Sequence, residues 1–164
     1  MPPDLYKSGF GKNFMAFSQQ KMREIVFQLL YSWDFAYGAE ADMTDMIMRQ
    51  LAVTKKVVRN AMEQVQLIRE RRDEIDQLIS GMSKSYDFSR IPRIERNVLR
   101  LGVFELFFAG GIPPKVAISE AIRLCRKFAT PEAASFINAI LDALYTEGVA
   151  KRDEEEHNDL SLSH

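Results

Sequence analysis

Histidine and cysteine are almost absent from the body of this 164-residue chain. Both histidines, His157 and His164, lie in an acidic C-terminal stretch, and Cys125 is the one cysteine. The body therefore holds no serine–histidine or cysteine–histidine nucleophile pair, no histidine or cysteine-rich zinc site and no intrachain disulfide. A carboxylate-only enzyme stays open, but no acidic pair stands out. We expect a non-enzymatic protein without metal, cofactor or catalytic residues, in the reducing cytoplasm.

Long apolar runs and phosphate-binding glycine loops are also missing. No apolar stretch approaches the roughly 18–20 residues that span a bilayer, and no basic-then-apolar leader opens the chain. The longest candidate, 98–108, is interrupted by Arg100 and Glu105. We therefore expect no membrane association and no nucleotide-binding loop.

The net charge of −1 excludes no class of binding partner by itself, but the charge is unevenly distributed along the chain. Residues 151–164 carry two cations against five carboxylates, whereas residues 84–130 hold nine Lys or Arg against four Asp or Glu. The excess of cations over 84–130 indicates an anionic partner. Ordinary solvated helix surfaces would give the same count, so charge alone does not decide between the two.

Apolar residues recur at helical spacing along most of the chain, and no run alternates with the period of a strand. Proline and glycine mark the boundaries, as at Pro92 and at Thr130-Pro131, which suit an N-cap and a first helical residue. The stretch 98–108 is apolar on nearly every side, which predicts a central, buried helix. Helices are expected over about 18–37, 43–52 and 54–79, and from Pro92, Pro113 and Thr130 onward.

The predicted fold class is all-α, with two packed helical bundles of about six to seven helices in total. A flexible arm over 1–17 precedes an all-helical domain over 18–150, with subdomains over about 18–80 and 88–148. The acidic stretch 151–164 is predicted to be a disordered tail, because it has too few apolar residues to bury.

Four blocks in order carry a resemblance to a known family. They are REIVFQLLYSW at 23–33, ERNVLRLGVFEL at 95–106, IPPKVAISEA at 112–121 and FINAILD at 136–142. Together they resemble the first helix, central helix, P-x-x-V-A-I-N-E-A segment and last-helix motif of the NusB-type transcription antitermination factors. The likeness extends from about residue 18 to residue 147.

This resemblance implies a two-bundle helical fold and binding to the single-stranded boxA segment of nascent ribosomal transcripts. It also implies a partner, the small-subunit ribosomal protein called NusE, and assembly into an antitermination complex on RNA polymerase. Relatives usually carry an arginine-rich run before the first helix, where this chain has Gln19 and Gln20. Fewer cations neutralise fewer phosphates, so we expect a shallower salt dependence of RNA binding.

Four RNA-contact candidates lie on the first helix. Lys21 and Arg23 are expected to contact phosphates, with simple solvation as the alternative. Gln28 is expected to hydrogen-bond base edges and Tyr31 to stack on unpaired bases, and a half-buried core role is equally open for the tyrosine.

The last helix supplies two more candidates, Glu132 and Phe136. Phe136 lies one position off the apolar stripe and suits base stacking, or ordinary packing. Glu132 lies in a first turn, where an acid also complements the helix dipole. Glu105, inside the apolar stretch, is expected to have a cationic partner, since a buried unpaired carboxylate is costly. Cys125 is expected to be an inert core residue.

Three other functions stay open. One is a helical protein-interaction module with weak or lost RNA binding, which the glutamines at 19 and 20 would allow. Another is the RNA-targeting part of a ribosomal-RNA cytosine methyltransferase, to which similar domains are fused. A third is a homodimer that hides the RNA surface. Salt-dependent RNA binding and sedimentation separate these functions from one another.

Overall fold

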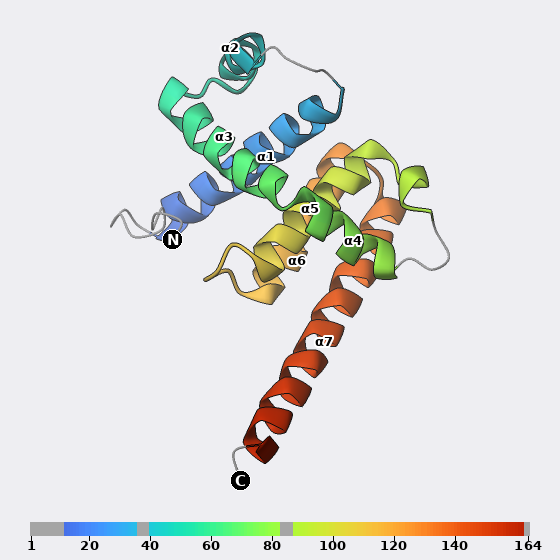
Figure 1. The fold of residues 1–164 in the computed structure, drawn as a ribbon. Helices are drawn as coiled ribbons and strands as arrows, with labels where there is room; N and C mark the ends of the chain where they lie inside the picture. The colour runs from blue at the N-terminus through green and yellow to red at the C-terminus, as the bar shows by residue number, and fades with distance from the viewer. Residues whose placement is uncertain (1–11, 36–39, 83–86, 163–164) are drawn as a thin grey trace.

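The computed structural model describes residues 12–35, 40–82 and 87–162, and every regular element in these ranges is helical. This confirms the all-α prediction. Within these ranges, seven α-helices and one short 3₁₀ turn follow each other (Figure 1). They are α1 (Lys12–Phe35), α2 (Glu40–Leu51), α3 (Lys55–Glu70), α4 (Arg72–Met82), η1 (Phe88–Arg90), α5 (Arg93–Phe107), α6 (Pro114–Phe128) and α7 (Pro131–Leu162).

The helices gather in two groups around α5. Figure 1 shows α1, α2 and α3 on one side of α5, and α4, α6 and α7 on the other. One continuous cluster of buried apolar side chains passes through both groups. The subdomain boundaries at 18–80 and 88–148 stay a prediction. Among the described residues, no helix has the length and apolar character needed to cross a membrane.

The central position of α5 follows from its sequence, as expected. All side chains from Val98 to Glu105 are buried, including the charged Arg100 and Glu105. Close packing needs a small residue where neighbours approach, and Gly102 provides it. A methyl group at Gly102 would lie 2.9 Å from the nearer Cδ atom of Leu141 on α7. Gly110 and Gly111, at φ of 69° and 73°, turn the chain after α5 in a region that favours glycine.

The start of α7 follows the capping chemistry that the sequence predicts, and a similar cap opens α3. The hydroxyl of Thr130 accepts a hydrogen bond of 3.1 Å from the backbone N–H of Ala133, and Pro131 opens α7. The hydroxyl of Thr54 accepts one of 3.3 Å from Val57 N–H at the start of α3. Each hydroxyl satisfies a backbone donor that has no partner inside its helix.

Helix boundaries differ from the sequence prediction in several places, and α2 begins at Glu40 rather than at about residue 43. Helix α1 begins at Lys12 rather than at Ser18, because residues 12–17 contain no Gly or Pro to interrupt it. The single helix expected over 54–79 is divided into α3 and α4 at Arg71, inside the charged stretch where a break was one of the alternatives. Ile68 before the break and Ile75 after it are both buried in the core.

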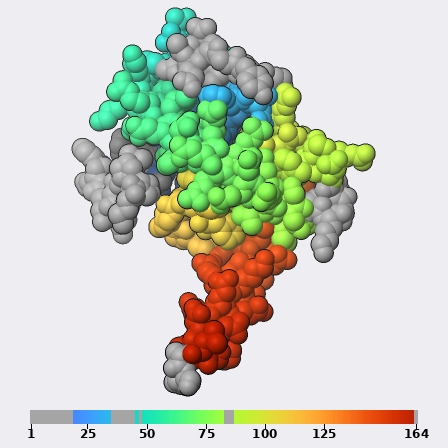
Figure 2. All heavy atoms as spheres, viewed as in Figure 1, coloured from blue at the N-terminus to red at the C-terminus, as the bar shows by residue number. Residues whose placement is uncertain are grey.

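The C-terminal stretch also differs from the prediction. It was expected to be disordered, but α7 continues as a helix to Leu162. Every side chain over 150–162 is exposed, and Figure 2 shows this part of α7 standing clear of the body in that view. Its Lys, Arg and Glu residues have good helix propensity, which explains a helix without tertiary partners.

Arg100 joins three helices at one end of the core. It forms a bidentate pair with Asp76 of α4, at 2.8 and 3.0 Å, and its Nη1 donates to Asp34 of α1 at 3.0 Å. Asn97 supports the cluster, because its Nδ2 donates to Asp34 at 2.9 Å. The Arg100 side chain is 4% exposed, so these bonds replace its hydration.

We expect Arg100→Leu to lower the free energy of unfolding by about 3–5 kcal/mol, because it leaves the Asp34 and Asp76 carboxylates facing each other without a cation. Urea denaturation followed by circular dichroism measures the change. Arg126→Leu removes the same group from an exposed position and should change stability by less than about 0.5 kcal/mol. Equal losses in the two variants would contradict the structural role of the cluster.

Removing residues 151–164 should leave the free energy of unfolding within about 0.5 kcal/mol of the full chain, because every described side chain that is lost, over 151–162, is exposed. Thermal denaturation of the truncated and full chains tests this. A clearly lower midpoint for the truncated chain would mean that the last turns of α7 pack on something in solution.

Candidate nucleic-acid interface

Helix α1 has a polar face that is not part of the core. Ile25 and Leu29 are completely buried on one side, whereas Lys21, Gln28 and Tyr31 are partly exposed. Gln28 lies seven residues after Lys21 and three residues before Tyr31, so the three side chains follow each other along one side of the helix. The structure therefore places three of the predicted RNA contacts on one surface.

Helix α6 meets this face through a network of polar side chains. Arg123 Nη1 donates to Glu24 Oε1 at 2.7 Å, and Lys127 Nζ donates to Glu24 Oε2 at 2.8 Å. Arg123 Nε also donates to Glu120 at 2.8 Å, and Glu120 accepts from Gln20 Nε2 at 3.1 Å. These bonds fix the position of α6 relative to α1.

Glu24 is the acceptor that both cations share. Partial burial raises the pKa of this carboxyl, but the hydrogen bonds and charges of Lys127 and Arg123 outweigh burial and hold its pKa below the ordinary value. Glu24 is therefore a carboxylate at neutral pH. The predicted interface thus contains an internal anion that the sequence analysis did not single out.

Aromatic rings lie where α1 meets the end of α6. The ring of Phe27 lies 4.9 Å from that of Phe128 at the end of α6 and 6.3 Å from that of Tyr31, measured between centroids. Phe136 on α7 is half-buried and packs against the core, whereas Glu132 in the first turn of α7 is exposed. Tyr31 and Phe136 thus combine packing with partial exposure.

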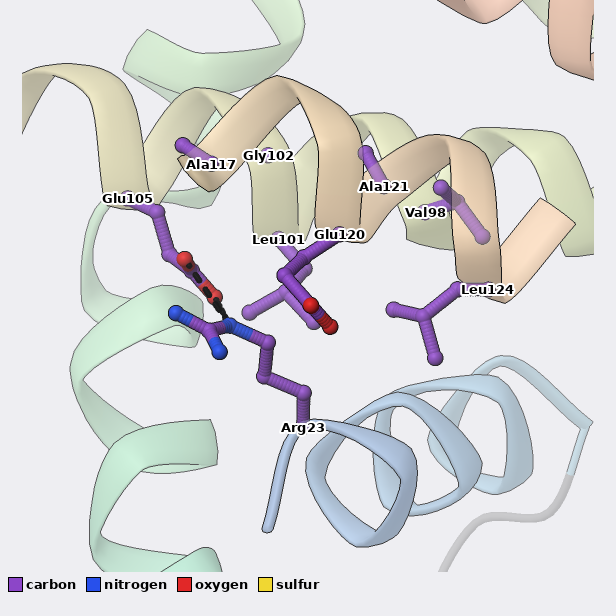
Figure 3. Close-up of a pocket in the computed structure, with 9 residues that line it drawn as sticks. All are labelled: Arg23, Val98, Leu101, Gly102, Glu105, Ala117, Glu120, Ala121 and Leu124. Carbon is purple, nitrogen blue, oxygen red and sulfur yellow. Dashed lines mark hydrogen bonds and ion pairs between the residues drawn. The ribbon is translucent and has the colours of Figure 1, made fainter. Parts of the chain in front are cut away.

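Arg23 lies apart from the other candidates. Its side chain is 9% exposed, and Nε donates to both oxygens of Glu105, at 2.9 and 3.1 Å (Figure 3). The cationic partner expected for Glu105 is confirmed, and it is a residue expected to contact RNA. This geometry favours a structural role for Arg23, whose phosphate contact stays a prediction.

The surroundings of the Arg23–Glu105 pair are largely apolar. Figure 3 shows Leu101, Ala117 and Leu124 around it, between α1, α5 and α6. Burial raises the pKa of Glu105, the charge and hydrogen bond of Arg23 lower it, and nearby Glu120 raises it again, so the result lies above the ordinary value. A raised pKa means that ionised Glu105 costs stability at pH values above it.

Cys125 has the inert character that was expected. It is buried on α6, and burial raises the pKa of its thiol to about 11, with a smaller contribution from Glu95. Little reactive thiolate therefore exists at neutral pH.

Comparison with known proteins gives one consistent result. A model of the NusB family matches residues 20–146. The transcription antitermination protein NusB of Chlamydia pneumoniae is 43% identical over 131 residues, which cover 80% of this chain and 82% of that protein. The protein of the same name from Geobacter sulfurreducens is 37% identical, over 74% of this chain and 89% of its own length.

Comparison with solved structures also finds NusB proteins. NusB of T. maritima superposes with a TM-score of 0.66 at 31% identity, covering 79% of this chain and 91% of that one. A structure of antitermination factors NusB and NusE in complex with double-stranded RNA contains a chain with a TM-score of 0.69 at 26% identity. The superposition covers 80% of this chain and 98% of that one.

The Arg23–Glu105 pair gives a stability prediction. Arg23→Ala or Glu105→Ala should each lower the free energy of unfolding by about 3–5 kcal/mol, because each leaves a charge buried without its partner. The double variant Arg23→Met with Glu105→Leu should recover most of that loss, since it replaces both charges with apolar groups. Lys21→Ala is the control, at a more exposed position. A stable Arg23→Ala variant would contradict the structural role.

Proposed function

Because the chain belongs to the NusB family, we propose that it is a non-enzymatic RNA-binding factor of transcription antitermination. It binds a boxA-type segment of nascent, especially ribosomal, transcripts together with NusE. The complex then acts on RNA polymerase to suppress termination. Such a factor works where transcription takes place, in the cytoplasm.

One observation carries the proposal beyond family membership. The polar face of α1, which α6 joins through bonds to Glu24, holds three of the six residues expected to contact RNA, Lys21, Gln28 and Tyr31. Two more, the exposed Glu132 and the half-buried Phe136, lie near the start of α7. RNA recognition of single strands combines cations for phosphates with aromatic rings for unstacked bases. The solved complex of NusB and NusE with double-stranded RNA contains a chain of similar fold, together with a protein partner and an RNA partner.

Each residue expected to contact RNA has a role that suits its chemistry. Lys21 contacts a phosphate, and Gln28 hydrogen-bonds a base edge. Tyr31 and Phe136 offer the exposed parts of their rings to unstacked bases. Glu132 accepts a hydrogen bond from a base amino group, and Arg23 supports the surface through its bond to Glu105 of α5.

The small number of free cations affects the expected binding. Gln19 and Gln20 replace cations at the start of the surface, and Arg123 and Lys127 are engaged by carboxylates. Weak intrinsic RNA affinity is therefore expected, and NusE supplies the additional binding surface. An interaction module without RNA binding is the competing function, and the experiment below separates the two.

The test is a titration of boxA RNA and a scrambled RNA at several salt concentrations, with and without NusE. We expect selective binding to boxA that NusE strengthens. Lys21→Ala should weaken it and reduce the slope of log K against log salt by about 0.7, the value for one phosphate contact on a single strand. Lys151→Ala, on the exposed end of α7, is the matched control. Equal, weak binding to both RNAs in the presence of NusE would reject the proposal.

A further inference from the structure

The polar network between α1 and α6 is electrically balanced. Two carboxylates, Glu24 and Glu120, face two cations, Arg123 and Lys127, and the four side chains are joined by bonds of 2.7–2.8 Å. A surface that binds phosphates gains affinity from uncompensated positive charge. This part of the surface therefore offers less attraction than its cations alone would give.

Glu24 occupies a central place on the proposed RNA surface. It lies three residues after Lys21 and four before Gln28, so all three share one side of α1. Its side chain is 15% exposed, which keeps its charge only partly screened by water. A phosphate bound by Lys21 would be repelled by this carboxylate.

The two cations held by Glu24 differ in how firmly they are bound. Arg123 is 28% exposed and also donates to Glu120 and to the backbone oxygen of Gln20, so three groups fix it. Lys127 is 53% exposed, and among the described residues the one hydrogen bond of its ammonium goes to Glu24, while the ring of Phe128 lies 5.6 Å away. Lys127 is thus the cation that can leave the network.

We propose that Glu24 limits the RNA affinity of this surface by holding Lys127 on its carboxylate, so that Lys127 is a reserve phosphate contact. This inference rests on the proposed function and adds a residue that sets its strength. When a neutral side chain replaces Glu24, Lys127 contacts a phosphate and the repulsion of the RNA backbone ends. The RNA affinity then rises, because a phosphate contact is gained and a repulsion is lost.

The first variant to test is Glu24→Gln, which keeps the shape and the acceptor for Arg123 but removes the charge. We expect boxA RNA to bind roughly three- to tenfold more tightly. This is the gain expected when the repulsion between one carboxylate and a phosphate several ångströms away is removed in a water-like medium. The salt slope should become steeper by about 0.7, since one more phosphate is contacted. Glu155→Gln, on the exposed end of α7, removes the same charge away from the surface and should leave affinity within twofold.

A double-mutant cycle assigns the gain to Lys127. Lys127→Ala should weaken binding by less than twofold in the natural sequence, where Glu24 holds the ammonium. The same change in the Glu24→Gln background should remove at least threefold. Because Lys127 is exposed, the single variant folds even if Glu24→Gln does not, and a large loss from it alone would overturn the inference.

The outcomes separate the inference from the function on which it rests. If the natural protein with NusE does not prefer boxA RNA, the proposed function fails and the inference fails with it. If that preference is present but Glu24→Gln binds equally or more weakly, with an unchanged unfolding midpoint, only the inference fails. Glu24 would then position α6 rather than limit RNA affinity.

Discussion

Helix α5 is buried on every side although it carries charged residues, and the rest of the structure depends on this constraint. A helix with Arg100 and Glu105 inside the core is stable only if neighbours supply opposite charges. Helix α1 provides Asp34 near one end and Arg23 near the other, and α4 adds Asp76. These pairs specify which helices lie next to α5 and in which register, beyond what apolar packing alone requires.

The same constraint orients the proposed RNA surface. Because Arg23 and Asp34 both point toward α5, the rotation of α1 about its axis is fixed at two places. Lys21, Gln28 and Tyr31 are consequently held on the outer side, beside α6. A site built on rigid helices presents its groups at fixed spacing, which favours recognition over adaptation. Core pairing and the placement of the proposed RNA contacts are thus two consequences of one helix orientation.

Charge balance is the second property that shapes function. The chain has a net charge of −1, and most of the cations near the proposed interface are paired with carboxylates. Tight binding to any polyanion is therefore not expected from the chain alone. Selectivity would come from base contacts and from NusE, because nonspecific phosphate attraction is kept low.

The sequence by itself determined the all-helical class, the buried central helix, the capped start of α7 and the need for a cation beside Glu105, since spacing, proline and apolar runs are local properties. It also carried the family resemblance. Only the tertiary structure decided that this cation is Arg23, that Glu24 holds Lys127, and that the helix over 54–79 breaks at Arg71. Pairs separated by 82 or 103 residues depend on how helices pack, and helical spacing along one segment holds no information about its distant neighbours.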